Sequence, residues 1–280
     1  IGVSRFSDAG VRQKLEDAGI ETVRCDLSCR EDVDALPRTK NVVYLAGRKF
    51  GTSGSEHLTW AMNTVVPTLV AEAFSESRIV VFSTGCVYPL VSQETGGCTE
   101  TSPPRPVGEY AQSCLGRERV FEFFSHRDAV RVLLLRLNYA VDLRYGVLAD
   151  IAQRVRAGCP VDNSVGFFNV IWQGDACRMA LLSLGQAATP PDILNVTGPE
   201  ILSTEDTARR FGDLFGKAVC FSSDGAGDCC YLSNPGKAIG LFGKPDMSAG
   251  ELIRMQAAWI EQGGATLNMP THFEVNDGTF

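Results

Sequence analysis

The stretch Arg78-Ile79-Val80-Val81-Phe82-Ser83-Thr84-Gly85-Cys86-Val87-Tyr88 runs from an apolar, β-rich segment into a short polar one. A second segment, residues 130–135, is almost continuously apolar. Such runs are typical of strands in a parallel sheet that is covered on both faces. The two segments therefore predict central strands of a buried sheet, with a polar segment at the carboxyl end of one of them.

Outward from these strands, β-rich and helical segments alternate along the first two thirds of the chain. Further strands are expected at residues 21–25 and 41–45, and helices at residues 9–18, 56–74 and 110–124. This alternation predicts the α/β class with a doubly wound parallel sheet.

The pattern changes after about residue 143, where helices dominate. They are expected at residues 149–157, 175–184, 204–215 and 247–262. We therefore expect a main domain over residues 1–142 and a smaller mixed lobe over residues 143–269 whose strands return to the main domain. Residues 270–280 have no periodicity, which predicts a C-terminal tail on the surface.

The composition indicates a globular protein without nucleic-acid or membrane partners. The net charge is −7, the basic residues are scattered, and no apolar run is long enough to span a bilayer. The ten cysteines form no CxxC pair, and only three histidines accompany them. These features favour free thiols in a reducing cytoplasm and predict no metal site.

A second motif follows the first along the chain. Tyr110-Ala111-Gln112-Ser113-Cys114 opens an expected helix, and it comes after the strand that ends near Thr84. The ordered pair resembles the extended short-chain dehydrogenase/reductase family of the NAD(P)-dependent epimerase/dehydratase type. There a strand ends in Ser-Ser/Thr-x-x-Val-Tyr-Gly, and a later helix carries Tyr-x-x-x-Lys. The resemblance implies a Rossmann-like dinucleotide-binding domain, with Thr84 bonded to the substrate oxygen and Tyr110 as general acid/base.

Position 114 departs from the family pattern. The family's lysine lowers the pKa of a tyrosine whose ordinary value is about 10, and it also holds the nicotinamide ribose. Cys114, as a neutral thiol in a partly buried site, can do neither. Lys49, in a loop that borders the cofactor in relatives, is slightly favoured as a substitute cation over Arg117, which lies about 10 Å of helix rise from Tyr110. A nucleophilic role for Cys114 is favoured less.

The remaining family landmarks match strand ends and helix positions in the same order along the chain. The resemblance implies that these residues bind NAD(P): Ser4, Arg5, Asp26, Leu27, Leu45, Ala46, Gly47, Asn63, Ser83, Asn138 and Tyr139. A small residue followed by arginine, Ser4-Arg5, suits the 2′-phosphate of NADP, which favours NADP slightly over NAD. The alternative is that Arg5 is an ordinary surface cation.

Family members open with a strand and a Gly-x-x-Gly-x-x-Gly turn that approaches the pyrophosphate. This sequence has no such turn, and Ile1-Gly2-Val3-Ser4-Arg5 looks like the end of the second strand. We therefore expect that a βα unit of about 30 residues precedes Ile1 in the natural protein.

The preferred function is NAD(P)-dependent redox chemistry on a secondary alcohol or ketone, as in nucleotide-sugar epimerases, dehydratases or reductases. Two alternatives remain: a non-catalytic nucleotide-binding member, which Cys114 favours, and an atypical member with lyase or thiol-dependent chemistry. The resemblance also implies a homodimer in which helices 56–74 and 110–124 form a four-helix bundle.

Overall fold

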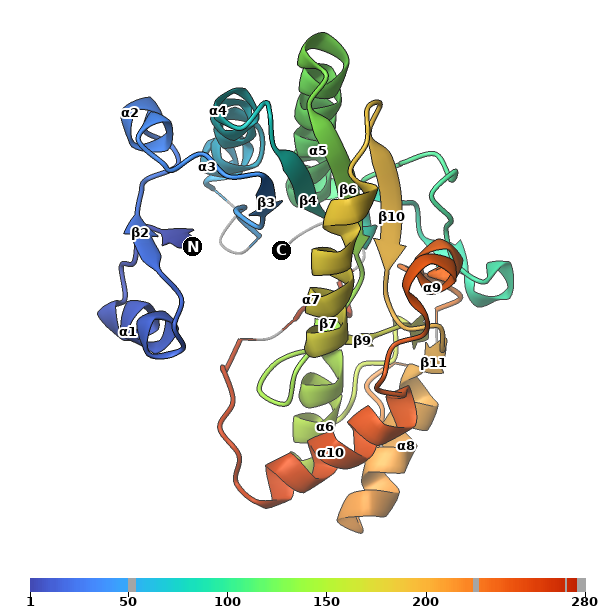
Figure 1. Ribbon diagram of the computed structural model, residues 1–280. Coiled ribbons are helices and arrows are strands. Elements are labelled where there is room, and N and C mark those ends of the chain that lie inside the picture. Colours follow the sequence, from blue (N-terminus) through green and yellow to red (C-terminus); the bar gives the residue numbers. More distant parts are fainter. Residues whose placement is uncertain (50–53, 224–226, 270, 276–280) are drawn as a thin grey trace.

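Four parallel strands form the central sheet (Figure 1). The computed structural model describes residues 1–49, 54–223, 227–269 and 271–275. In sheet order the strands are β10 (Asp192–Val196), β6 (Arg131–Leu137), β4 (Arg78–Thr84) and β3 (Asn41–Tyr44). All three neighbouring pairs are parallel, which confirms the predicted parallel sheet. The carboxyl ends of these strands therefore lie at one edge.

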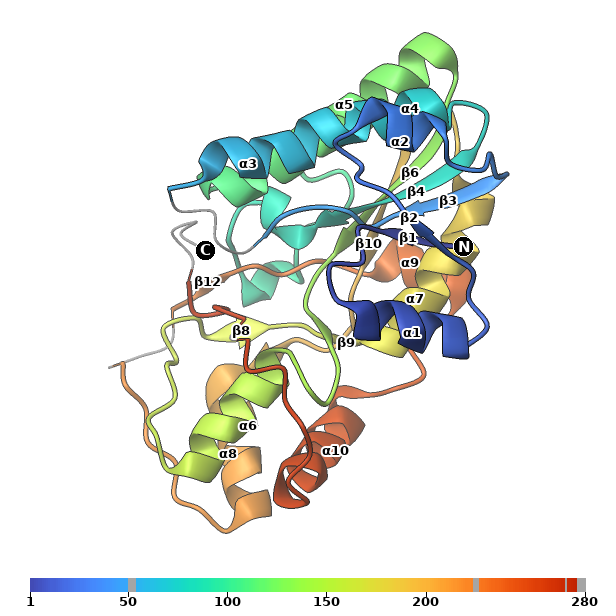
Figure 2. The ribbon, with the colours of Figure 1, turned by 90° about the vertical axis from the view of Figure 1, so that its left-hand side faces the viewer.

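Side chains alternate between two cores along the central strands. Ile79 and Val81 of β4 join one buried cluster, whereas Val80 between them joins another. The first cluster includes α4 (Val66–Ala73) and α5 (Gly108–Asp128), and the second includes α7 (Gln173–Leu182) and α9 (Gly236–Phe242). Because successive side chains of a strand point to opposite faces, helices cover both sides of the sheet (Figure 2), as predicted.

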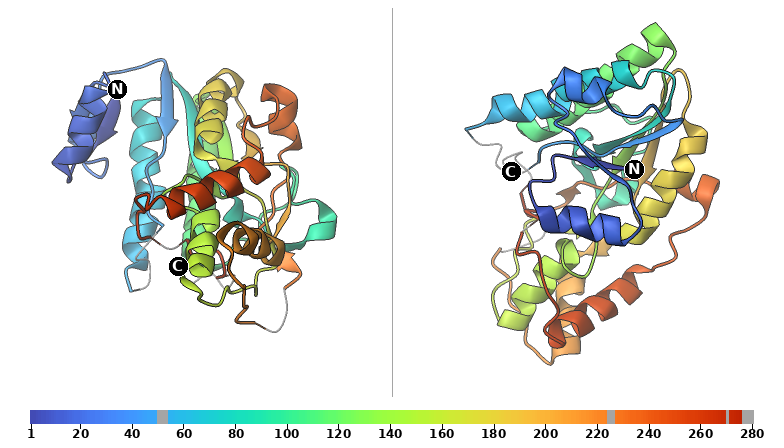
Figure 3. Two further views of the ribbon diagram at one scale, coloured as in Figure 1. Left: turned by 90° about the horizontal axis from the view of Figure 1, so that it is seen from below. Right: turned by 60° about the vertical axis from the view of Figure 1, so that its left-hand side comes forward.

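A second, two-stranded sheet stands apart from the first. The strands β1 (Gly2–Ser4) and β2 (Thr22–Arg24) pair in parallel through the crossover helix α1 (Ala9–Asp17). Figure 3 shows this unit at the side of the molecule, beyond β3. Asp8 starts α1 as its N-cap, since its carboxylate accepts a hydrogen bond from the Gly10 N–H at 2.8 Å. The predicted segment Ile1–Arg5 therefore contains a strand, Gly2–Ser4, but within the described residues this strand pairs with β2 alone.

The helix predicted over residues 56–74 contains an unforeseen π-helical turn. It consists of α3 (Glu56–Trp60), the π turn η1 (Ala61–Val65) and α4. Pro67 lies at the start of α4 and has no N–H to donate to the carbonyl four residues earlier, at Asn63. A missing bond of this kind accounts for the wider turn at that point.

Helices α6 (Val147–Ala157), α8 (Thr204–Phe215) and α10 (Ala249–Glu261) enclose a third core. Ser203 caps α8, and Ser248 caps α10 in a reciprocal capping box with Glu251. The remaining elements are α2 (Arg30–Asp34), β5 (Val91–Ser92), β7 (Ala140–Val141), β8 (Phe167–Phe168), β9 (Ile171–Trp172), β11 (Leu202–Ser203), β12 (Cys229–Cys230) and the 3-10 turns η2 (Gly85–Val87), η3 (Gln93–Thr95) and η4 (Ser183–Gln186). None of the helices in the described ranges is both long enough and apolar enough to cross a membrane.

Part of the C-terminal tail is buried, so the prediction that it lies on the surface was wrong for two residues. Thr271 and Phe273 are 3% and 5% exposed. The N–H and hydroxyl of Thr271 donate to Oδ2 of Asp150 at 2.8 and 2.6 Å, and the Phe273 ring packs against Phe168. Their partners lie more than a hundred residues earlier, where no local pattern indicates them. Residues 270 and 276–280 lie outside the described residues.

Candidate active site

The sheet topology brings three predicted segments to one edge. Residues 45–47 follow β3, Thr84 ends β4, and residues 138–139 follow β6. These are the carboxyl ends of adjacent parallel strands. Ligands of open α/β sheets bind at this edge, so a binding site is expected there.

The Cys86 thiol lies beside both Thr84 and Tyr110. The turn η2 follows β4 directly, and the Thr84 hydroxyl accepts a hydrogen bond from the Cys86 N–H at 3.2 Å. Burial raises the pKa of the Cys86 thiol, while its hydrogen bond with Thr84 lowers it. Burial also raises the pKa of Tyr110 well above its ordinary value, and the Cys114 and Cys86 thiols raise it further. The two predicted catalytic hydroxyls therefore share a neighbour, the partly buried Cys86.

Cys114 lies in the interior rather than in the partly buried setting that we expected. It is 1% exposed and belongs to a cluster with Val87, Tyr88 and Cys98. Burial raises the pKa of its thiol to about 11, although the Arg117 charge acts in the opposite direction. Such a thiol is neutral at physiological pH and supplies no charge to Tyr110.

Asn63 joins the loop after β3 to α5. It lies in the π turn and is fully buried. Its Oδ1 accepts hydrogen bonds from the Arg48 N–H at 2.9 Å and from Nη2 of Arg117 at 2.5 Å. Its Nδ2 donates to the Arg48 carbonyl at 3.1 Å and to Oγ of Ser113 at 2.8 Å. The side chain thus fixes the backbone next to Gly47, at the predicted cofactor edge.

Lys49 is the second cation near the thiols. Burial lowers the pKa of its ammonium group, and the charges of Cys86, Asp150 and Cys114 raise it. Asp150 belongs to α6, so Lys49 lies between the strand ends and the α6 side of the molecule.

Asn138 and Tyr139 complete the edge. Nδ2 of Asn138 donates to Oδ1 of Asn169 at 2.7 Å and to the Tyr231 carbonyl at 3.2 Å. A Cβ atom at Gly85 would lie 2.9 Å from Oδ1 of Asn138, so glycine permits this close approach. Tyr139 has a φ of 40°, which is uncommon for a non-glycine residue and is often found at functional sites.

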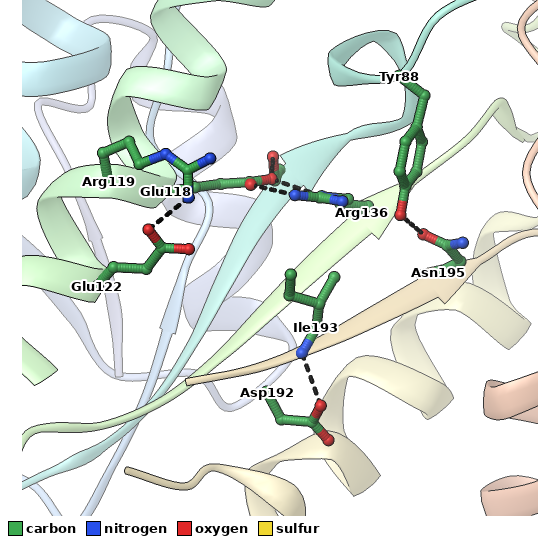
Figure 4. A network of polar contacts seen from close by, with 9 residues as sticks. Tyr88, Glu118, Arg119, Glu122, Arg136, Asp192, Ile193 and Asn195 are labelled. Atoms are coloured by element: carbon green, nitrogen blue, oxygen red, sulfur yellow. Dashed lines mark hydrogen bonds and ion pairs between the residues drawn. The ribbon is translucent and has the colours of Figure 1, made fainter. Parts of the chain in front are cut away.

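A buried ion pair lies beneath the strand ends (Figure 4). Oε1 and Oε2 of Glu118 accept hydrogen bonds from Nε and Nη2 of Arg136 at 2.9 and 2.6 Å. The Ser83 hydroxyl donates to Oε1 of Glu118 at 2.5 Å. Because Ser83 precedes Thr84, this group connects α5, β4 and β6 directly below the candidate catalytic residues.

The predicted residues of the β1–β2 unit form a second group. A cavity of about 420 Å³ at the carboxyl ends of β1 and β2 is lined by Arg5, Ser7, Arg24, Asp26 and Asp32. Hydrogen bonds from Ser28 lower the pKa of Asp26, so this carboxylate is ionised. Ser4 and Leu27 are the neighbours of these lining residues in the chain. The residues that line this cavity are polar, and they carry both positive and negative charges.

A further cavity lies between α6 and the buried part of the tail. Its volume is about 300 Å³, and Arg144, Tyr145, Asp150 and Arg154 contribute to its lining. Burial raises the pKa of Asp150, whose hydrogen bonds with Thr271 act in the opposite direction.

Two site residues were missed in the sequence. Cys86 lies inside the segment 78–88 that predicts a central strand, and neither Cys86 nor Asn169 was predicted to have a role in the site. Cys86 could have been found from its position two residues after Thr84. Asn169 orients Asn138 by a side-chain contact over 31 residues, and no sequence signal indicated it.

Comparison with known families decides the classification. A family described as "NAD dependent epimerase/dehydratase family" matches residues 1–141, half of the chain. The chain belongs to this family. The expected resemblance is therefore confirmed. No curated protein sequence matches the chain.

Solved structures of the family support the fold. The Bordetella bronchiseptica enzyme WbmG, solved with NAD, has a TM-score of 0.77 and 21% identity over 96% of this chain and 88% of its own. The Thermus thermophilus UDP-glucose 4-epimerase, solved with NAD, has a TM-score of 0.73 and 21% identity, over 92% and 98% of the two chains. RMD from Pseudomonas aeruginosa, solved with NADPH, has a TM-score of 0.73 and 17% identity, over 94% and 100%. The fold of these structures therefore extends over nearly the whole chain.

Proposed function

We propose that this protein is an NAD(P)-dependent epimerase, dehydratase or reductase that acts on a secondary alcohol or ketone, with nucleotide sugars as the first substrate class. The observation that carries the proposal is the Thr84 and Tyr110 pair around the Cys86 thiol, at the edge of the sheet where this family binds its ligands. We assign residues 1–142 to the dinucleotide and residues 143–269 to the substrate, with residues 270–280 as a tail.

The residues present fit the two ends of a dinucleotide. The polar cavity at Arg5 and Asp26 suits an adenosine ribose and its phosphate. At the other end, Gly47 is exposed and leaves the backbone accessible beside Asn63. Ser4, Leu27, Leu45, Ala46, Ser83, Asn138 and Tyr139 extend this proposed path between the two ends. When bound, the nicotinamide supplies the hydride donor or acceptor that side chains lack.

The protein's own task in this mechanism is to handle the proton. Tyr110 gives a proton to the substrate oxygen or takes one from it, and Thr84 orients that oxygen by a hydrogen bond. The high pKa of the buried phenol keeps it protonated in the resting protein, which suits the donor direction. Proton removal from an alcohol requires a positive charge nearby to make the phenolate accessible.

The test is turnover with a panel of UDP-sugars and simple ketones. The protein is mixed with NAD⁺ or NADP⁺ and each substrate, and the absorbance of the reduced nicotinamide and the sugar products are followed. Substrate-dependent reduction or an epimerised product is the expected result. Cofactor binding without turnover on any member of the panel contradicts the enzymatic proposal.

Cofactor choice gives a separate prediction at the β1–β2 cavity. Arg5→Ser should weaken NADPH binding by about tenfold or more, because a charge-assisted hydrogen bond contributes about 1.5–3 kcal/mol. NADH affinity should stay close to that of the parent protein. Titration calorimetry with both cofactors measures the difference, and Arg12→Ser on the exposed face of α1 is the matched control. Equal losses for NADH and NADPH contradict a phosphate contact by Arg5.

A second candidate function is nucleotide binding without catalysis. The observation in its favour is the neutral, fully buried Cys114 at the position of the family's lysine. This candidate predicts measurable cofactor affinity that Tyr110→Phe leaves unchanged, and no product with any substrate. For thiol-dependent chemistry, Cys114→Ser separates the outcomes, because unchanged activity excludes the thiol.

A homodimer is proposed through the long helices. Large apolar side chains on these helices are exposed: Leu58 on α3 by 45%, Val65 on the π turn by 59%, and Phe123 on α5 by 55%. Burial of such side chains in a four-helix bundle stabilises association. Val65→Glu should therefore convert dimer to monomer in light scattering at micromolar concentration, whereas Leu181→Glu on α7 should not. A monomeric parent protein contradicts the proposal.

A further inference from the structure

Arg117 is a buried cation whose hydrogen bonds lead toward the candidate site. Its side chain comes from α5, one turn beyond Cys114, and it is 5% exposed. Nη1 donates to the Phe82 carbonyl at 2.8 Å, near the end of β4, and Nη2 donates to Oδ1 of Asn63 at 2.5 Å. These two bonds hold the guanidinium between β4 and the π turn.

The guanidinium also touches the strand end after β3. A Cβ atom at Gly47 would clash with Nη2 of Arg117, so the glycine makes room for the cation. Gly47 itself is exposed. The positive charge therefore lies one backbone layer beneath the accessible edge of the sheet, where its field is weakly screened.

A chain of hydrogen bonds connects Arg117 to Tyr110. Arg117 bonds Oδ1 of Asn63, Nδ2 of Asn63 donates to Oγ of Ser113 at 2.8 Å, and that hydroxyl donates to the Tyr110 carbonyl at 2.8 Å. The first turn of α5 and the cation are thus parts of one polar unit. The chain ends at the backbone carbonyl of Tyr110, so it fixes the first turn of α5 relative to the guanidinium, and the Arg117 charge lowers the pKa of the phenol.

We propose that Arg117 is the positioning cation of this site, and that it supplies to the Tyr110 phenol the positive charge that Cys114 cannot. This inference rests on the proposed function, because it assigns Arg117 a role in tuning that acid/base. Arg117 acts through Tyr110 and Asn63, and it needs no contact with the substrate.

The charged and titratable groups around Tyr110 are consistent with this role. Cys114 and Arg117 face it from α5, and Cys86 faces it from η2; the thiols raise the pKa of Tyr110 and Arg117 lowers it. Lys49, from the loop after β3, interacts with the two thiols and with Asp150. Lys49 lowers the pKa of the Cys86 thiol, and Arg117 lowers the pKa of the phenol.

The experiment measures the ionisation of Tyr110 directly. Difluorotyrosine, whose phenol ionises at lower pH than that of tyrosine, is placed at position 110 in the full chain and titrated by fluorine NMR. Arg117→Gln should raise the pKa of this phenol by about one unit, because an adjacent opposite charge shifts a pKa by that order. Arg117→Lys, which keeps the charge, should stay near the parent value. Arg119→Gln is the matched control, since Arg119 is an exposed residue of the same helix.

An unchanged phenol pKa in a folded Arg117→Gln protein overturns the inference. If that variant does not fold, Gly47→Ala provides the second test, because its Cβ displaces Nη2 and should raise the same pKa. Gly185→Ala, where a Cβ meets no atom within 4 Å, is its control. In an active enzyme, the pH–rate profile should shift in the same direction as the pKa of the Tyr110 phenol. A phenol that responds to Arg117 in a protein without any turnover refutes the proposed function and leaves this inference intact.

Discussion

Replacing Tyr110 with phenylalanine is expected to lower kcat by about 10²–10⁴-fold, because a positioned general acid/base contributes a factor of that size. Tyr110 is partly buried, and the Cys86 and Cys114 thiols lie near its phenol. Cofactor affinity should change little, since the ring remains and only the hydroxyl is lost. Steady-state rates on the best substrate, together with a cofactor titration, measure both quantities.

Tyr44→Phe is the matched control for this loss. Tyr44 is a 3% exposed core residue of β3, and its hydroxyl makes no hydrogen bond within the described part of the chain. Its removal should leave kcat close to that of the parent. A Tyr110→Phe enzyme that keeps the parent kcat shows that the proton follows another path. This result excludes Tyr110 as the acid/base and leaves only the proposed role of Thr84.

The central strands could be predicted because their own apolar residues indicate that both faces of the sheet are buried. The run 130–135 is apolar at every position except Arg131, since β6 is covered on both faces. Helix α8 was predicted with its observed bounds because Ser203 caps it and Gly216 ends it in the left-handed region. Local signals of this kind act within a few residues.

The contacts of the site could not be predicted, because they join distant segments. The bond from Arg117 to Asn63 spans 54 residues, and Asn63 lies in the π turn Ala61–Val65. Helix rise placed the Arg117 backbone about 10 Å from that of Tyr110. It did not predict the direction of a long, flexible side chain. For this reason Lys49, the nearer candidate by family position, was ranked above Arg117.

Burial in the tail was missed for a similar reason. Thr271 and Phe273 lie in a segment without periodicity. Thr271 bonds to Asp150 and Phe273 packs against Phe168, and both partners belong to other elements. A single apolar residue in a polar segment is common on surfaces, so its burial depends on a partner that the local sequence does not contain.

The ion pair below the strand ends gives the largest expected effect on stability. Glu118 and Arg136 are 0% and 2% exposed in their side chains, and two hydrogen bonds join them (Figure 4). Glu118→Ala leaves the guanidinium buried without a counter-charge, which costs about 3–5 kcal/mol in the free energy of unfolding. Urea unfolding followed by circular dichroism measures this loss.

The same figure contains the control. Arg119 and Glu122 form a surface pair on α5 at 2.6 Å, with 55% and 25% exposed side chains. Glu122→Ala should cost less than about 1 kcal/mol, because solvent screens the pair. Equal losses for the two variants contradict the prediction. Glu118→Leu combined with Arg136→Met should recover much of the stability, since it removes both buried charges.

The stability prediction also bears on activity, because Glu118 connects the helix of Tyr110 to the strand of Thr84. Its carboxylate accepts the Ser83 hydroxyl beside Thr84, and it lies two turns along α5 from Tyr110. The apolar double variant keeps the packing but loses this bond to β4. We therefore expect it to be stable and yet slow, with kcat reduced and KM nearly unchanged, whereas a purely structural ion pair predicts that recovery of stability restores kcat as well.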